Sequence, residues 1–168
     1  GDLFRLALSG GGALLARRVL VASGITDELP AIEGLRERWG REVIHCPFCH
    51  GWEVRDQRVV QIVTSPLALH PTPLMRHLTD TLTVVLHDGV EVDAEAVRRL
   101  EASGVMVIAG TVTRVTDADD ALGIDLADGS RIAADAVLVG ATFHARVDAL
   151  TGLGLEATPH ATGFGEVL

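Results

Sequence analysis

The sequence predicts an α/β protein in which a parallel sheet carries flanking helices and an antiparallel hairpin layer. Two observations predict it. Short apolar β-type runs alternate with helical segments between residues 58 and 117, the pattern of a parallel sheet covered by helices. A hairpin-and-strand pattern at residues 122–140 also occurs at residues 4–22. The beginning of the chain is therefore expected to be the end of a second, similar domain.

The first expected element is a β-hairpin that leads into a strand. Leu3–Leu8 alternates and then meets the turn sequence Ser-Gly-Gly-Gly, and Ala16–Ala22 has the composition of a buried strand. The pattern recurs without a gap 118 residues later in Leu122–Gly140, where the Val-Leu-Val of Val19–Val21 meets that of Val137–Val139. We interpret the match as two copies of one unit. A chance likeness between two amphipathic hairpins is the alternative, since short β patterns carry little information.

Between the two copies lies a complete α/β unit. Its expected elements are, in order, strand Arg58–Thr64, helix Pro71–Asp80, strand Thr81–His87, helix Asp93–Gly104 and strands within Val105–Asp117. Alternation of this kind implies a Rossmann-like domain.

The chain is expected to have four parts. These are the end of an incomplete domain (1–24), a linker with a Pro and repeated Gly (25–45), the Rossmann-like domain (46–143) and a return segment with little core (144–168). The apolar residues of the return segment are expected to be exposed, as for a segment that has lost an intramolecular partner: Leu153, Leu155 and Phe164.

Composition narrows the function classes. No apolar run approaches the roughly 18 residues that span a bilayer, so no membrane protein is expected. The sequence has 14 cationic and 23 acidic residues, and the resulting net charge of -9 argues against nucleic-acid binding. The start resembles no export signal, so we expect a cytoplasmic, reducing location. Two close cysteines there are more often catalytic or metal-binding than structural.

The segment His45–Glu53, HCPFCHGWE, contains the only two cysteines. Cys46, Cys49 and His50 match the haem-attachment pattern C-x-x-C-H, but attachment occurs outside the cytosol and needs a distal ligand, so haem is set aside. Structural zinc sites have four protein ligands. His45 and His50 lie too close in sequence to the single C-x-x-C to complete a relaxed tetrahedron with it. No metal is therefore expected. Structural zinc and a pair of inert buried cysteines remain as alternatives.

Redox chemistry explains the motif best. Two thiols at i and i+3 can close a disulfide ring, and a neighbouring imidazole, here that of His50, can take a thiol proton. A glutaredoxin would need a long helix after the motif. Here residues 50–57 contain Gly and β-forming residues and pass directly into the strand Arg58–Thr64.

The chain resembles the low-molecular-weight thioredoxin reductases, flavoprotein disulfide oxidoreductases of the class II pyridine-nucleotide type, from about residue 4 to its end. In that family a C-x-x-C, an acid and Gly precede the first strand of an NADPH domain inserted within the FAD domain. The match is specific at Ala22–Gly24, where the family has Ala-Thr-Gly close to the flavin, and at Cys46, Cys49 and Gly51. The resemblance implies FAD, with Ser23 and Gly24 as cofactor-binding residues and residues 1–24 as the end of the FAD domain.

The same resemblance implies roles for the motif. Cys49 would face the flavin and Cys46 would exchange with the substrate. His50 replaces the family's acid, and C-x-x-C-H-G looks like the FAD-dependent dithiol oxidases that close disulfides in gliotoxin- and holomycin-type metabolites. A His there suits the deprotonation of a thiol near neutral pH. The implied catalytic residues are Cys46, Cys49 and His50.

The expected dinucleotide site departs from the family pattern. Val63–Ala68 replaces the glycine-rich turn G-x-G-x-x-A, and the side chains of Val63 and Ser65 would crowd a pyrophosphate. His87–Gly89 replaces the family's basic pair for a 2′-phosphate. NAD(P)H is therefore a doubtful cofactor. Gly10–Gly12 is expected to be a turn, because a strand and not a helix follows it.

The leading hypothesis is an FAD-dependent dithiol/disulfide oxidoreductase that passes electrons from a dithiol to FAD and oxygen, and whose isolated chain is inactive without its FAD domain. Its substrate would be a small-molecule dithiol or a thioredoxin-like protein, and its assembly a homodimer. The alternatives are an NAD(P)H-dependent disulfide reductase and a non-catalytic Rossmann-like binding or dimerisation module.

Overall fold

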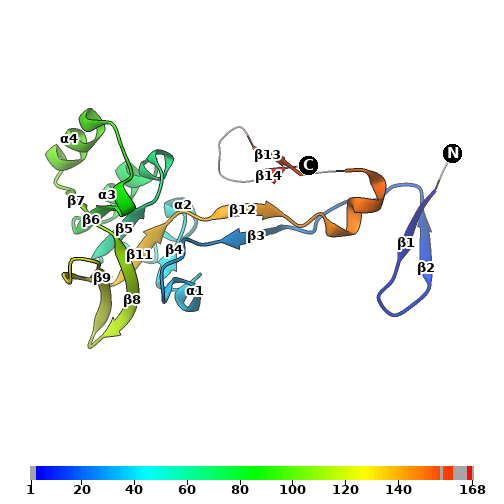
Figure 1. The fold of residues 1–168 in the computed structure, drawn as a ribbon, viewed down its shortest axis with the longest axis horizontal. Coiled ribbons are helices and arrows are strands. Elements are labelled where there is room, and N and C mark those ends of the chain that lie inside the picture. The colour runs from blue at the N-terminus through cyan, green and yellow to red at the C-terminus, as the bar shows by residue number, and fades with distance from the viewer. Residues whose placement is uncertain (1–2, 156, 161–165, 168) are drawn as a thin grey trace. The chain divides into compact units, whose positions relative to one another are not determined.

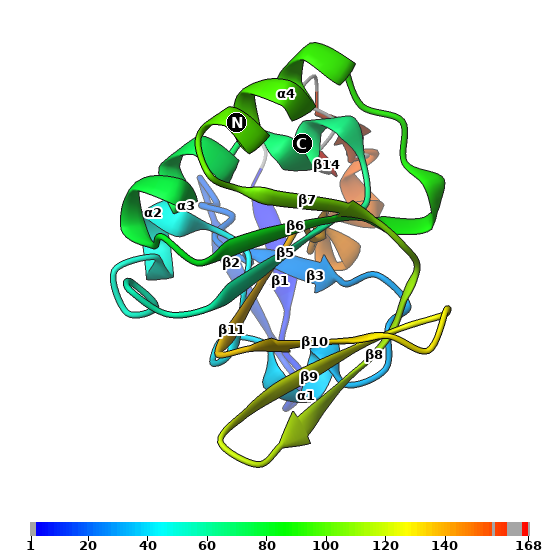
Figure 2. The same ribbon diagram turned by 90° about the vertical axis from the view of Figure 1, so that its left-hand side faces the viewer.

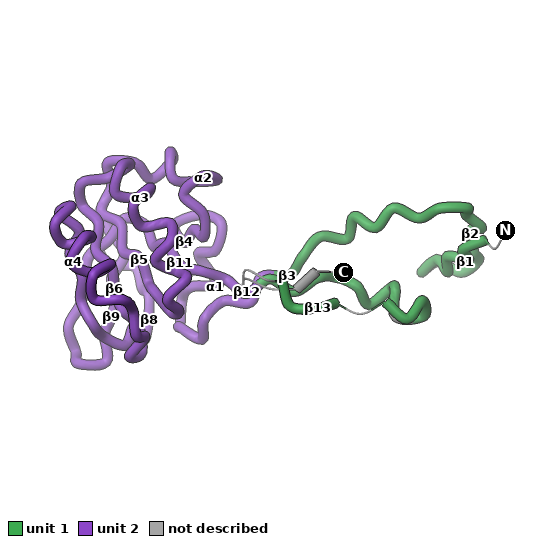
Figure 3. The backbone as a smooth tube through the Cα atoms, turned by 90° about the horizontal axis from the view of Figure 1, so that it is seen from above, with its two compact units in different colours: residues 1–26, 143–168 green, residues 27–142 purple. Residues whose placement is uncertain are grey.

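The computed structural model describes residues 3–155, 157–160 and 166–167. The chain forms two units, residues 1–26 with 143–168 and residues 27–142, coloured green and purple in Figure 3. Within the described residues no helix has the length and apolar character needed to cross a membrane.

The larger unit is built on a five-stranded parallel sheet. Its strands, in spatial order, are β4 (Val43–Ile44), β11 (Ala136–Val139), β5 (Val59–Val63), β6 (Leu82–Leu86) and β7 (Met106–Ala109). All five residues of β5 are buried, as expected for a strand covered on both faces. The predicted α/β fold with a Rossmann-like parallel sheet is confirmed.

Helices cover one face of this sheet and an antiparallel sheet covers the other (Figure 2). The covering elements are α3 (Thr72–Leu78) and α4 (Ala94–Ala102) on one side, and β8 (Val112–Ala118), β9 (Ala121–Leu126), β10 (Arg131–Ala134) and α1 (Leu35–Arg38) on the other. Alternate residues of β5 face the two layers. Val60 and Ile62 pack towards the antiparallel sheet, and Val59 and Val63 towards the helices.

Residues 25–45, expected to form a linker, instead contribute β3 (Ile25–Glu28), α1 and β4. Leu35 in α1 has no exposed surface. Gly34 approaches β8 so closely that a β-carbon there would lie 2.0 Å from the carbonyl oxygen of Val115. The expectation of a linker was wrong because β4 is only two residues long and α1 four, too short to leave a periodic signal among the glycines.

The smaller unit begins with the predicted hairpin, β1 (Phe4–Ala7) and β2 (Ala13–Ala16) (Figure 1). Its register is that of β9 and β10 shifted by 118 residues, since Phe4 pairs with Ala16 as Leu122 pairs with Ala134. The turns also agree: Gly11 has a φ of 85° and Gly129 a φ of 86°. In each turn this glycine's amide donates to the carbonyl three residues earlier, at 3.0 Å. The two copies therefore share one hairpin geometry, with glycine where the turn requires a positive φ.

The copies differ beyond the hairpin. The second continues into β11, which pairs with β4 and β5, whereas no strand forms over the expected range Ala16–Ala22 beyond the end of β2. Leu20 is 91% exposed. Among the described residues no strand pairs with this segment, so its backbone lacks the neighbours that hold β11.

The return segment contributes β12 (Thr142–Ala145), which pairs with β3, a 3₁₀ helix η3 (Asp148–Leu153), and β13 (Thr158–Pro159) paired with β14 (Glu166–Val167). Leu153 and Leu155 are exposed, as expected from the sequence. Phe164, expected to be exposed with them, lies outside the described residues.

Candidate active site

The two cysteines lie on a single helical turn, α2 (Pro47–His50), which follows β4. Cys46 is the N-cap residue, and its carbonyl oxygen accepts hydrogen bonds from the amides of Cys49 and His50, each at 3.1 Å. Pro47 suits the first helical position because it has no amide hydrogen to satisfy. Residues three and four apart on one turn project to the same side, so this turn gathers Cys46, Cys49 and His50. The long helix of a glutaredoxin is absent from this place, as predicted.

Gly51 ends this turn at a place where no larger residue fits. A β-carbon at Gly51 would lie 2.4 Å from the carbonyl oxygen of Pro47 and 2.5 Å from Cδ1 of Leu78 in α3. The φ of Gly51 is an ordinary -65°, so close packing and not backbone conformation requires glycine. The glycine of the C-x-x-C-H-G motif thus lets α2 pack tightly against α3.

Both cysteines are free thiols, Cys49 exposed and Cys46 half-buried. A hydrogen bond between the two side chains raises the pKa of the Cys49 thiol above its usual value, and partial burial and the charge of Cys46 raise it further. The Cys49 sulfur therefore holds its proton more firmly than a free cysteine does.

His50 contributes an imidazole with an unused nitrogen. Its Nδ1 is buried and has no hydrogen-bond partner. A buried polar atom left unpaired costs about 1–3 kcal/mol, so a ring nitrogen in this state favours a ligand or a proton when one arrives. The predicted thiol base therefore lies on the same turn as both cysteines.

His45, which was not among the predicted catalytic residues, packs beside the motif. The ring of His45 lies 5.7 Å from that of Trp39 and 6.4 Å from that of His50, measured between centroids. Trp39 Nε1 donates to Oδ2 of Asp27 at 3.0 Å. Burial lowers the pKa of His45, against the opposing effect of Asp27, and His50 lowers it further. The only sequence signal for His45 was its place directly before Cys46.

The structure also brings three ligand atoms together. One atom each from His45, Cys46 and Cys49 lies within 4.8 Å of the other two. Proximity in sequence, which argued against His45 as a ligand, does not prevent this arrangement, because His45 directly follows β4 while Cys46 caps α2 and Cys49 lies within it.

The predicted cofactor residues Ser23 and Gly24 belong to the smaller unit, and the cysteines belong to the larger one. Ser23 Oγ donates to the carbonyl oxygen of Arg146 at 2.6 Å, and the Arg146 amide donates to that of Gly24 at 3.2 Å. Gly24 has a φ of 73°, and no atom lies within 4 Å of where its β-carbon would be. The backbone at Gly24 is therefore uncovered on the side where a β-carbon would lie. Arg146 was not foreseen.

The segment after β5, where the family has its glycine-rich dinucleotide turn, has a different local structure here. After β5 the chain forms a 3₁₀ helix, η1 (Pro66–Leu69), and α3 starts only at Thr72. Gln61, a buried residue of β5, donates from Nε2 to the carbonyl oxygen of Ala68 at 2.6 Å and so ties this segment to the strand. The turn Gly10–Gly12 joins β1 to β2, as predicted, and leads into no helix.

A groove of about 610 Å³ lies near the carboxyl end of β6. Its lining is mostly apolar and carries one acidic and one basic side chain: Leu86, Val90, Glu91, Val92, Ala94, Val97 and Arg98. The neighbouring 3₁₀ turn η2 (His87–Gly89) is fixed by His87, whose Nδ1 accepts from the amide of Val112 at 3.0 Å.

Comparison with known proteins gives a consistent result, although no family model matches the chain. The thioredoxin reductase sirT of Leptosphaeria maculans is 28% identical over 120 residues, 66% of this chain and 37% of that protein. The crystal structure of HlmI matches with a TM-score of 0.82 and 44% identity, over 93% of this chain and 49% of that one. An oxidoreductase from Agrobacterium tumefaciens matches with a TM-score of 0.86 and 33% identity, over 98% of this chain and 54% of that one.

The chain thus spans about half the length of the solved structures it matches, and less of the first curated relative. The resemblance inferred from the residues around the cysteines is confirmed by these comparisons.

Proposed function

Because this chain is a relative of the thioredoxin-reductase-like oxidoreductases, we propose that it is the dithiol-bearing part of an FAD-dependent thiol-disulfide oxidoreductase. One observation carries the proposal. Cys46 and Cys49 are free, are joined by a hydrogen bond and stand on one helical turn with the unpaired Nδ1 of His50. This is the composition of a redox dithiol with its own proton acceptor.

In the proposed reaction a substrate dithiol becomes a disulfide and the Cys46–Cys49 disulfide becomes two thiols. His50 takes the proton of one substrate thiol, whose sulfur attacks Cys46, and Cys49 leaves and receives that proton. The second substrate thiol then displaces Cys46, so that two protons and two electrons have moved to the protein. The raised pKa of Cys49 means that its sulfur keeps the proton once the disulfide has opened.

FAD, when bound, would accept the electron pair of this dithiol and deliver it to oxygen. Ser23 and Gly24 would lie along the cofactor, since the open backbone at Gly24 accommodates a planar group and the Arg146 contacts hold the loop in shape. The rest of the cofactor would have to be held by residues beyond these two.

The proposed electron acceptor is oxygen and not a pyridine nucleotide. The local structure after β5 supports this choice, because a 3₁₀ helix tied to Gln61 through Ala68 stands where a glycine turn would admit a pyrophosphate. The proposed substrate is a small-molecule dithiol, with a thioredoxin-like protein as the second possibility. The proposed assembly is a homodimer, which the molar mass from light scattering tests.

A second candidate is an NAD(P)H-dependent disulfide reductase. The name of the relative sirT favours it, and so does the groove beside the carboxyl end of β6, the region where this fold class takes up nucleotides. A non-catalytic binding module is the third candidate, and the exposure of Leu153 and Leu155 is the observation in its favour.

The test measures oxygen consumption by a purified protein that contains this chain together with the expected FAD domain, loaded with FAD and supplied with dithiothreitol as the dithiol. We expect turnover that is abolished in Cys46→Ala and Cys49→Ala and reduced by about 100-fold or more in His50→Gln, within the usual range for loss of a general base. His77→Gln, which changes an exposed imidazole of α3, is the matched control and retains the rate.

Two other outcomes would favour the alternatives. Oxidation of NADPH at a catalytic rate, with little consumption of oxygen, would show that the protein is a disulfide reductase and not an oxidase. If the protein binds no flavin and exchanges no disulfide with dithiothreitol, the non-catalytic binding module is the candidate function that remains.

A further inference from the structure

We propose that the reduced Cys46–Cys49 pair and His45 together form a Zn²⁺ site. Each of the three side chains offers one ligand atom, and these atoms all lie within 4.8 Å of one another. Two thiolates and an imidazole nitrogen are donors that zinc prefers. The inference concerns the dithiol itself, so it stands or falls independently of FAD and of the direction of electron flow.

The spacing is close to that of a bound site. Tetrahedral zinc, with bonds of about 2.3 Å to sulfur and about 2.0–2.1 Å to nitrogen, sets its ligand atoms roughly 3.5–3.8 Å apart. Because the present atoms all lie within 4.8 Å of one another, they need to approach by at most about 1 Å. Rotation of the exposed Cys49 and the half-buried Cys46 can supply this movement while the backbone of α2 stays in place.

His45 is held ready to act as a ligand. It directly follows β4, a strand of the central sheet, and its ring packs against that of Trp39. Trp39 is in turn held by the hydrogen bond from its Nε1 to Asp27. Supporting contacts of this kind keep a ligand ring in one orientation and strengthen metal binding.

No fourth ligand from the described part of the chain joins these three atoms. His50 does not belong to the group of atoms within 4.8 Å, and the exposed Cys49 marks the side from which water can complete the tetrahedron. Three protein ligands and one exchangeable position distinguish this arrangement from the closed four-ligand sites that stabilise folds.

Zinc binding and disulfide formation would exclude each other because they use the same sulfurs. Binding replaces two S–H bonds by two Zn–S bonds and releases two protons. Oxidation instead joins the sulfurs by an S–S bond and removes two protons and two electrons. The site would therefore exist only in the dithiol state, and zinc would protect that state from oxidants.

The experiment uses the reduced 168-residue chain, titrated with Zn²⁺ against a chromophoric chelator and with Co²⁺ as a spectroscopic probe. We expect one metal per chain, thiolate-to-cobalt charge-transfer absorption with tetrahedral d–d bands, and loss of both after oxidation to the disulfide. His45→Ala and the more shape-conserving His45→Asn should each weaken zinc binding by about 100-fold, at least as much as the loss of a supporting group does. His77→Gln should bind as the parent does.

Two results would overturn the proposal. If both His45 variants bind Zn²⁺ as tightly as the parent, and circular dichroism confirms their fold, then only the two thiols bind the metal and His45 is not a ligand. Affinity of the parent chain no greater than that of Cys46→Ala would remove the site altogether. A kinetic readout checks the same point, since saturating Zn²⁺ should slow disulfide formation by diamide at least tenfold in the parent and much less in the His45 variants.

Discussion

Gly51 lies so close to Pro47 that a β-carbon on the glycine would fall 2.4 Å from the proline's carbonyl oxygen. The contact is made within the turn that carries both cysteines. The same β-carbon would fall 2.5 Å from Cδ1 of Leu78. Substitution must therefore displace either α2 or its packing on α3.

We accordingly expect Gly51→Ala to lower the free energy of unfolding by about 1–3 kcal/mol, the usual cost of overpacking. The measurement is urea unfolding followed by circular dichroism. Gly140→Ala is the matched control, because no atom lies within 4 Å of its would-be β-carbon, and it should change stability little. Equal effects of the two substitutions would contradict the role given to Gly51.

Removal of the Cys46 thiol should make Cys49 more acidic. In Cys46→Ala the hydrogen bond and the negative charge that raise the pKa of Cys49 both disappear, so this pKa should fall towards its ordinary value. Cys49 would then be a thiolate at lower pH. The pH dependence of thiolate ultraviolet absorbance measures the shift, and Cys46→Ser, which keeps an acceptor, should show a smaller one. A rise in the pKa of Cys49 in Cys46→Ala would refute the effect assigned to the Cys46 side chain.

Equivalent leucines of the two sequence copies should differ in how much they contribute to the free energy of unfolding. Leu138 in β11 is 1% exposed and Leu20 is 91% exposed. Leu138→Ala should lower the free energy of unfolding by about 2–5 kcal/mol, the range for a buried leucine. Leu20→Ala should change it by less than about 0.5 kcal/mol, as surface substitutions do. Urea unfolding of the 168-residue chain tests both. A large loss in Leu20→Ala would mean that this segment is packed in solution.

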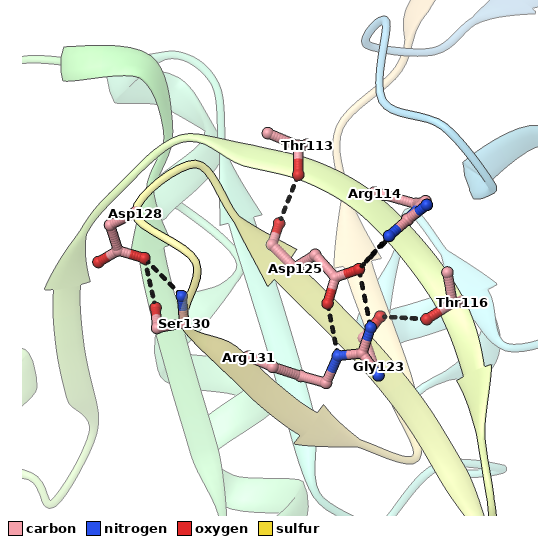
Figure 4. A network of polar contacts seen from close by, with 8 residues as sticks. All are labelled: Thr113, Arg114, Thr116, Gly123, Asp125, Asp128, Ser130 and Arg131. Atoms are coloured by element: carbon pink, nitrogen blue, oxygen red, sulfur yellow. Dashed lines mark hydrogen bonds and ion pairs between the residues drawn. The ribbon is translucent and has the colours of Figure 1, made fainter.

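Asp125 joins two arginines on the antiparallel sheet (Figure 4). Arg131 donates from Nη2 to Oδ2 of Asp125 at 2.9 Å, and Arg114 from its own Nη2 to the same oxygen at 3.1 Å. Hydrogen bonds and charge from Arg131, followed by those from Arg114, hold the pKa of Asp125 below its ordinary value of 3.8 against the effect of partial burial. The folded state thus favours the ionised carboxylate.

Because the folded pKa of Asp125 lies below the unfolded one, its contribution to stability is complete above about pH 4 and is lost as the pH falls through the folded pKa. Asp125→Asn should therefore be less stable than the parent at neutral pH, and the difference should vanish in strong acid. Urea unfolding at a series of pH values measures it. Asp120→Asn, at an exposed position of the neighbouring turn, is the control and should show no such pH dependence. A difference that persists unchanged into acid would exclude the ion pairs as its cause.

Elements with strong patterns could be predicted closely from the sequence. β5 was expected at Arg58–Thr64 and is Val59–Val63, because a strand buried on both faces is a continuous run of β-branched and apolar residues. The dithiol could be predicted as well, since its chemistry depends on a spacing within one turn. β4 and α1 could not, because elements of two and four residues show no periodicity and are held by distant partners such as β11 and Val115.

The sequence by itself determined the two hairpins and their shared register, because a hairpin is specified by alternating residues and by glycines that supply the positive φ of its turn, at Gly11 and Gly129. Only the tertiary structure decided whether the Val-Leu-Val segment after each hairpin forms a core strand. Val137–Val139 is a core strand because β4 and β5 satisfy its backbone, and Val19–Val21 has no such neighbours among the described residues. Tertiary structure likewise brought His45 to the thiols, since the end of a sheet strand and the start of a helix meet there and no local pattern encodes that meeting.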